Sequence, residues 1–170
     1  MSQAPAREFR SFDPSSVPVA PFQRILVAID GSYDAGRALR FAAELAQYCQ
    51  ARLAVVHVIN DIDGLPAQFA WLGRASMHQY QNLGRKRLEL LTADLPADLM
   101  AERILRVGDP AEEILDVART WKADVIVTGN PAHAYLGHFL HHGVDDELLP
   151  HAPCSLLVIG PQPEVASNRS

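Results

Sequence analysis

Residues 24–32 read RILVAIDGS, and this stretch decides the fold. Apolar residues fill positions 25–29 without alternation, which is typical of a parallel strand covered by helices on both faces. Gly31 permits a sharp turn, and Ser32 can accept a hydrogen bond from an amide at the start of the next helix. Ligands of open α/β sheets bind beyond the carboxyl ends of the strands, so Asp30 stands at a candidate binding position. The alternative is that Asp30 only orders the turn or caps the helix.

Helical and strand-like patterns alternate along the rest of the chain. Apolar residues at three- and four-residue spacing in 35–49 predict an amphipathic helix. A less regular helix is predicted at about 67–95, with Gly73 and Gly84 as weak points. The sequence DPAE at 109–112 supplies a helix cap, a first-turn proline and an acid, which together indicate a helix start. The other predicted strands are 53–59, 103–107, 124–129 and 155–160. This order predicts an α/β fold with a doubly wound sheet.

The chain length of 170 residues fits one domain with tails. Prolines among small and charged residues predict a flexible N-terminal arm at 1–21, and a second tail is predicted at 161–170. The folded domain is therefore expected at 22–160.

Charge and cysteine usage narrow the classes of protein. A net charge of −5 lacks the basic footprint of a nucleic-acid binder. No apolar run approaches the ~20 residues that cross a bilayer, and the N-terminus lacks the pattern of a signal peptide. Cys49 and Cys154 form no CxxC pair, which suits a reducing compartment. We expect a cytoplasmic protein that binds neither nucleic acid nor membrane.

Five segments between residues 22 and 160 together resemble the universal stress protein family. They read RILVAIDGS, LAVVHVI, VGDPAEEIL, ADVIVTG and HAPCSLLVIG. Each motif alone is weak, but their order and separations are specific. The resemblance implies a five-stranded parallel sheet in the order 3-2-1-4-5, with helices on both faces. It also implies a homodimer paired through the fifth strands.

Members of this family divide into those that bind ATP and those that do not. The binding pattern after the fourth strand is G-x-x-G, nine residues, then G and Ser or Thr, whose backbone amides surround the phosphates. The gap-free alignment starts at Gly129 and places Ala132 and His142 where the other glycines are expected, and Gly143 where the hydroxyl is expected. Ala132 adds a Cβ where backbone and phosphate must approach closely. The resemblance therefore favours loss of tight ATP binding.

The positions that border adenosine in the family match this sequence better than the phosphate-binding positions do. By the resemblance, Ala28, Asp30 and Val58 border the adenine and ribose, and a carboxylate can accept hydrogen bonds from ribose hydroxyls. Two carboxylates at 145–146, near a helix start, would oppose a triphosphate. ATP, ADP and AMP remain candidate ligands. The predicted crevice comprises Ala28, Asp30, Val58, Gly129, Ala132, Gly143 and Val144.

Histidines gather around the altered loop. His138 and either His141 or His142 would share one helical face, which makes them weak candidates for a zinc, nickel or copper site. The alternatives are incidental histidines on a polar surface, or a surface that responds to pH. His57, inside an apolar strand, is interpreted as a core residue.

These patterns rank three classes of function. No nucleophile with an evident base and no complete phosphate loop is recognisable, so we expect a protein that is not an enzyme, with slow ATPase activity left open. The first interpretation is a stress-response or regulatory homodimer that acts through an unidentified protein partner. The alternative is an adenine-nucleotide sensor that uses the crevice, and the third is metal or pH sensing by the histidines.

Overall fold

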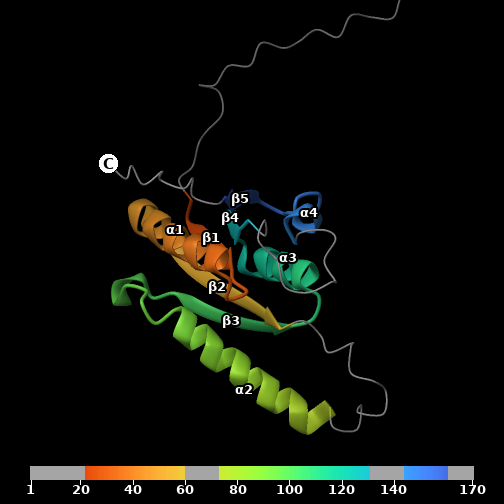
Figure 1. The fold of residues 1–170 in the computed structure, drawn as a ribbon. Coiled ribbons are helices and arrows are strands. Elements are labelled where there is room, and N and C mark those ends of the chain that lie inside the picture. Colours follow the sequence, from red (N-terminus) through yellow and green to blue (C-terminus); the bar gives the residue numbers. More distant parts are fainter. Residues whose placement is uncertain (1–21, 60–72, 131–143, 161–170) are drawn as a thin grey trace, which may run out of the picture.

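A computed structural model describes residues 22–59, 73–130 and 144–160. Its five strands form one parallel sheet in the order β3-β2-β1-β4-β5, which confirms the predicted fold and strand order (Figure 1). The strands are β1 (Arg24–Ala28), β2 (Arg52–Ile59), β3 (Glu102–Val107), β4 (Val125–Gly129) and β5 (Ser155–Ile159). The helical elements are α1 (Tyr33–Cys49), α2 (Gly73–Leu91), η3 (Ala97–Leu99), α3 (Pro110–Trp121) and α4 (Val144–Leu148).

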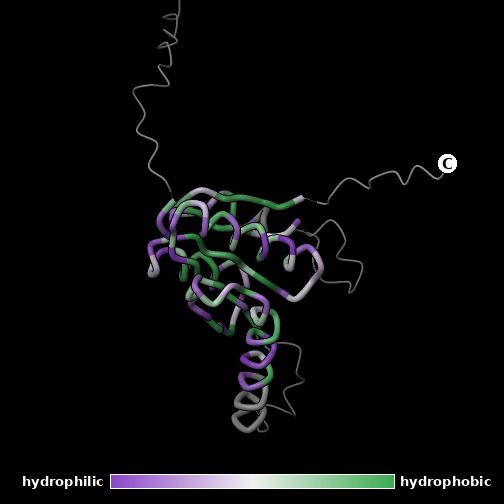
Figure 2. The backbone as a smooth tube through the Cα atoms, turned by 90° about the vertical axis from the view of Figure 1, so that its left-hand side faces the viewer, coloured by the Kyte–Doolittle hydropathy of each residue, from purple (hydrophilic) through white to green (hydrophobic). Residues whose placement is uncertain are grey.

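The continuous apolar runs form the buried middle of the sheet. Ile25, Leu26 and Val27 of β1 are each 0% exposed, because β1 lies between β2 and β4 and its side chains project into the apolar clusters on the two faces of the sheet. Figure 2 shows these hydrophobic strands inside the molecule, with more hydrophilic helix segments outside. Burial on both faces explains why the first strand shows no alternation of apolar and polar residues.

Helices cover both faces of the sheet and create two apolar clusters. On one face α1 packs with small residues against β1 and β4, and α2 packs over β2 and β3 (Figure 1). On the other face α3 and α4 pack against the second cluster. The buried positions of α1 include Ala35, Ala38, Ala42 and Ala46, whose small side chains let the helix approach the strands closely.

The second helix differs from its predicted form. It ends at Leu91 rather than 95, and positions 67–72 lie outside the described residues. Gly84 is a packing position rather than a weak point, because a Cβ there would lie 2.6 Å from Ile59 Cδ1 and 3.0 Å from Leu105 Cδ1. The absence of a side chain at Gly84 therefore allows α2 to pack closely against β2 and β3.

The amino ends of the strands are tied together by polar contacts. Asp124 Oδ2 accepts hydrogen bonds from the backbone N–H groups of Gln23 and Arg24, both at 2.8 Å. The Arg24 guanidinium donates to the Trp121 carbonyl at 2.8 Å. One carboxylate thus joins the start of β4 to the start of β1.

Candidate functional site

The carboxyl ends of β1, β2 and β4 meet at one edge of the sheet, because the strands are parallel and adjacent. Asp30 follows β1, Val58 lies near the end of β2, and Gly129 ends β4. Ala28, Val58 and Val144 all pack against the cluster on the α3 side of the sheet. Ala28, Asp30, Val58 and Gly129 therefore lie along this edge, and Val144 packs against the same cluster as Ala28 and Val58. Ala132 and Gly143 lie outside the described residues.

Asp30 is exposed and shapes the turn that it starts. Its Oδ1 accepts a hydrogen bond from the Ser32 N–H at 2.8 Å. Ser32 Oγ in turn accepts from the Ala35 N–H at 3.1 Å and caps α1, as the sequence predicted. A carboxylate has several acceptor positions, so one bond to the turn leaves capacity for a ligand hydroxyl. The turn-ordering role and a binding role are therefore compatible.

Arg87 of α2 supports the same turn, and sequence reasoning missed it. Its Nη2 donates to the Asp30 carbonyl at 2.9 Å, across a separation of 57 residues. Gly31 has φ +85°, and a Cβ there would collide with the guanidinium of Arg87. Gly31 is needed both for this backbone conformation and for the approach of Arg87.

Gly129 brings β4 against the first turn of α1. A Cβ on Gly129 would lie 2.5 Å from the carbonyl carbon of Asp34 and 2.7 Å from the Ala35 nitrogen. Both atoms belong to backbone, which cannot rotate out of the way as a side chain can. Glycine at 129 is therefore required by packing between strand and helix, whatever the ligand.

Thr128 is a second residue that sequence reasoning missed. It is 5% exposed, and its Oγ1 is the one buried side-chain polar atom without a hydrogen-bond partner among the described residues. The available signal was a hydroxyl in the otherwise apolar strand VIVTG, directly before Gly129. An unpartnered buried hydroxyl is uncommon and calls for an explanation.

The histidine predictions divide between described and undescribed residues. His57 is 7% exposed and its Nδ1 lies 2.8 Å from the Ile29 carbonyl oxygen, which confirms the core interpretation. His138, His141 and His142 lie outside the described residues. Within the described ranges, no group of three or more His, Cys, Asp and Glu side chains is arranged to hold a metal ion.

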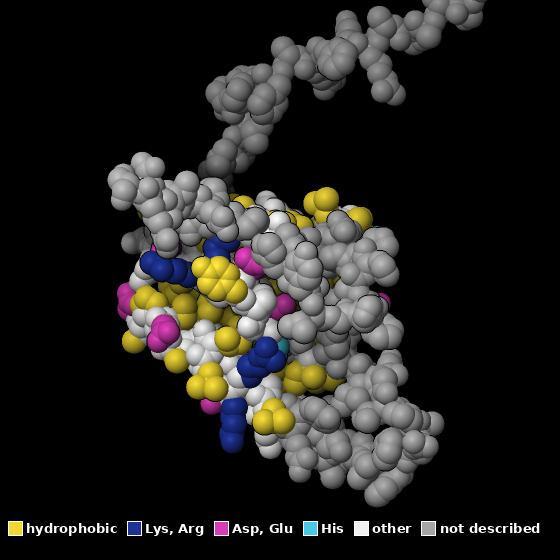
Figure 3. Space-filling view, in the orientation of Figure 1, with side chains coloured by type: hydrophobic (Ala, Val, Ile, Leu, Met, Phe, Trp, Pro, Cys, Tyr) yellow, Lys and Arg dark blue, Asp and Glu magenta, His cyan; other side chains and the backbone are white. Residues whose placement is uncertain are grey.

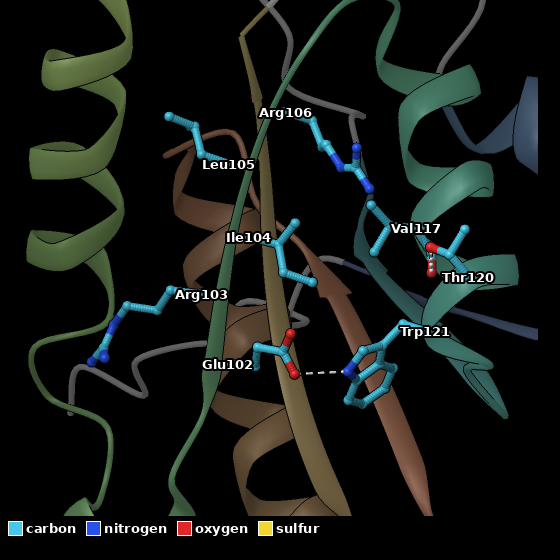
Figure 4. A pocket seen from close by; sticks show the side chains of 8 residues that line it. All are labelled: Glu102, Arg103, Ile104, Leu105, Arg106, Val117, Thr120 and Trp121. Carbon is cyan, nitrogen blue, oxygen red and sulfur yellow. Dashed lines mark hydrogen bonds between the residues drawn. The ribbon is translucent and has the colours of Figure 1, made fainter.

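A hollow of about 440 Å³ lies along the outer strand β3 and helix α3 (Figure 4). Glu102 and Ile104 point toward α3 in this view, and Trp121 Nε1 donates to Glu102 Oε2 at 2.9 Å. Arg106 pairs with Asp116 at 3.5 Å and approaches Glu113 at 3.9 Å. Because these charged groups already bond within the protein, a ligand in the hollow would have to compete with internal contacts for them.

The described surface carries mixed charge. In Figure 3, Lys and Arg side chains are interspersed with Asp, Glu and apolar side chains over the visible described residues. Within the same residues, no helix is both long and apolar enough to span a bilayer.

Comparison with known proteins identifies the family. The family model for the universal stress protein family matches residues 21–160. A curated relative, "Universal stress protein in QAH/OAS sulfhydrylase 3'region" from Thermus aquaticus, is 32% identical over 141 residues, which cover 81% of this chain and 98% of the relative. A solved structure of a universal stress protein family member from Burkholderia pseudomallei is 30% identical with a TM-score of 0.58, covering 84% of this chain and 98% of that one.

Two more distant structures carry a nucleotide. A universal stress protein in complex with cAMP is 20% identical with a TM-score of 0.56, covering 84% of this chain and 100% of that one. The protein from Archaeoglobus fulgidus in complex with dAMP is 21% identical with a TM-score of 0.53, covering 82% and 99%. These two show the shared fold. The sheet order, the turn after β1 and the match over residues 21–160 together place this chain in the universal stress protein family.

Proposed function

We propose that this protein is a regulatory homodimer that binds an adenine nucleoside monophosphate in the crevice at the ends of β1, β2 and β4. The observation that carries the proposal is the exposed carboxylate of Asp30, which stands at the carboxyl end of the central strand on a turn held by two hydrogen bonds. A carboxylate in that position can accept hydrogen bonds from ribose hydroxyls.

A monophosphate suits this chain better than a triphosphate. The sequence replaces two glycines of the family's phosphate pattern with Ala132 and His142 and adds carboxylates at 145–146, so side chains crowd the approach of the phosphates and negative charge is greater. The nucleotides held by the two structural neighbours, cAMP and dAMP, are both monophosphates. We therefore propose that the crevice binds an adenine nucleoside monophosphate and does not bind ATP tightly.

The remaining parts of the proposal concern assembly and action. The outer strand β5 ends the sheet, and its Val158 is 40% exposed, so this edge supports pairing with a second copy. We propose that the dimer is cytoplasmic, performs no catalytic step and acts through a protein partner whose binding depends on the nucleotide. Sensing of metal or pH by His138, His141 and His142 stays outside this proposal.

Calorimetric titration of nucleotide-free protein with AMP, cAMP and ATP tests the proposal. We expect micromolar binding of a monophosphate and weaker binding of ATP. Asp30→Asn keeps an acceptor oxygen for the Ser32 amide but loses the charge, so AMP affinity should fall about tenfold or more, as is typical for loss of a charged hydrogen bond.

The matched control is Asp98→Asn, which removes the same charge from an exposed residue of η3. It should leave AMP affinity unchanged. Absence of heat with all three nucleotides would refute nucleotide binding and leave protein partners as the route of action. Equal AMP affinity in wild type and Asp30→Asn would show that the ligand lies elsewhere.

A further inference from the structure

Buried polar side chains are few in the described part of the molecule, and nearly all have partners. The Asp34 carboxylate lies 3.6 Å from the Arg37 guanidinium. His57 Nδ1 lies 2.8 Å from the Ile29 carbonyl oxygen, so a protonated Nδ1 donates to that oxygen. The complete set in these residues is Asp34, His57, Thr92 and Thr128. The two threonines give the sharpest contrast.

Thr92 and Thr128 are both buried, but only the hydroxyl of Thr92 has hydrogen-bond partners. Thr92 is 0% exposed, and its Oγ1 donates to the Leu88 carbonyl at 2.7 Å and accepts from Arg103 Nε at 2.6 Å. Thr128 is 5% exposed and its Oγ1 has no partner. A buried hydroxyl without a partner destabilises the folded state, whereas valine of the same shape would not. The hydroxyl at 128 therefore needs a reason other than stability of the free protein.

The position of Thr128 supplies that reason. Alternation along β4 places its side chain on the same face as Ile126, which belongs to the cluster that packs against Ala28, Val58 and Val144. The pairing of β1 and β4 runs in register through Val27 and Val127, so Ala28 is the next neighbour of Thr128 across the strands. The unpartnered hydroxyl thus stands at the inner wall of the proposed nucleotide crevice.

We propose that the Thr128 hydroxyl is a ligand-binding group that hydrogen bonds to an oxygen of the ribose-phosphate unit of the nucleotide. The proposal rests on the proposed function of the crevice. Asp30 lies in the turn after the adjacent strand β1, two residues beyond Ala28, and neighbouring strands are about 4.8 Å apart with a rise of about 3.3 Å per residue. A ribose-phosphate unit is long enough to contact both the Asp30 carboxylate and the Thr128 hydroxyl. The Thr128 hydroxyl can take other staggered χ1 positions without movement of the strand, so its direction is adjustable when a ligand binds.

If the Thr128 hydroxyl binds the ligand, Thr128→Val should weaken AMP binding without lowering the melting temperature of the free protein. The variant keeps the shape of the side chain and removes the hydroxyl. In the free protein it should leave the melting temperature unchanged or raise it, because no internal hydrogen bond is lost. In the complex it should lower AMP affinity about five- to tenfold, the range of one neutral hydrogen bond.

Two control variants separate this role from a structural one. Thr128→Ser retains the hydroxyl and should bind AMP within about twofold of wild type, since the hydrogen bond remains. Thr92→Val removes a bonded hydroxyl far from the crevice, so it should lower the melting temperature and leave AMP affinity unchanged. The readouts are calorimetry with AMP and thermal unfolding without ligand, performed on the full chain.

The outcomes are distinguishable. Wild-type affinity for AMP in Thr128→Val overturns the proposal while leaving nucleotide binding intact. A melting temperature that falls in Thr128→Val as it does in Thr92→Val also overturns it, because the hydroxyl would then have an internal partner. If wild-type protein binds no AMP, the proposed function fails and this contact fails with it.

Discussion

The two ends of the sheet use polar groups in opposite ways. At the amino ends, Asp124 accepts from two backbone N–H groups, and Arg24 bonds to the Trp121 carbonyl. At the carboxyl ends, Asp30 is exposed and Thr128 has no partner. Polar groups at the amino ends of the strands therefore form hydrogen bonds that hold the fold together. Asp30 and Thr128 at the carboxyl ends keep hydrogen-bonding capacity that the fold does not use. We therefore expect substitutions at the amino ends to change the stability of the fold, and substitutions of Asp30 or Thr128 to change the affinity for a ligand.

The largest effect should come from a substitution that disturbs the packing of the carboxyl end. Gly129→Ala places a Cβ against the backbone of Asp34 and Ala35, and overpacking of this kind costs about 1 to 3 kcal/mol of unfolding free energy. Urea unfolding measures the loss. A loss of this size would show that the carboxyl end, where we propose ligand binding, contains one position that the fold itself requires.

Gly36→Ala is the matched control for that substitution. Gly36 lies inside α1, and nothing is within 4 Å of a Cβ there, so alanine should stabilise the helix by about 0.5 to 1 kcal/mol. Equal stability of Gly129→Ala and wild type would contradict the close contact between β4 and α1.

An intermediate effect is expected from the amino end. Asp124→Ala removes the acceptor for the Gln23 and Arg24 amides, and because water can reach these groups the loss should be about 1 to 2 kcal/mol. Chemical unfolding measures stability, and calorimetry measures AMP binding, which should not change. A loss of AMP affinity without loss of stability would break the division between the two ends.

The smallest effect concerns the thiol of Cys154, which adjoins Asp124. Burial raises the pKa of Cys154 above its ordinary value of 9.0, and the Asp124 carboxylate raises it further. The resulting stabilisation is present below pH 9.0 and is lost as pH rises through the higher folded-state pKa.

Alkylation of the thiol across a pH series measures this pKa. The folded protein should react at higher pH than the urea-unfolded chain, because less thiolate is present. Asp124→Asn removes the carboxylate and should move the folded profile toward lower pH, with the effect of burial remaining. Identical profiles for folded and unfolded protein would show that the amino end does not influence the thiol.

The sequence predicted the architecture better than the details of the site. Largely apolar runs located the strands, and the cap at Ser32 located the start of α1, because both signals are local. The sheet order came from the family resemblance. Gly84 was interpreted as a weak point because propensity scales describe an isolated helix and contain no information about Ile59 and Leu105 beneath it.

The missed site residues share a physical reason. Arg87 reaches the Asp30 carbonyl across 57 residues, and no local pattern announces such a contact. Thr128 is visible in the sequence as a threonine in an apolar strand, but threonine is common in strands. Its lack of a partner emerges only when every neighbouring donor and acceptor is placed in three dimensions.

The contact of Arg87 with the turn after β1 also has a consequence for binding kinetics. The guanidinium of Arg87 joins that turn to α2, a long helix that packs on β2 and β3. The turn that carries Asp30 is therefore held in place by a residue of another element. A ligand that binds as proposed would meet a turn that this hydrogen bond already orders, so less of its contact energy would be spent on ordering that turn. For such a ligand, we expect this turn to change little on association, so differences in affinity should appear mainly in the dissociation rate.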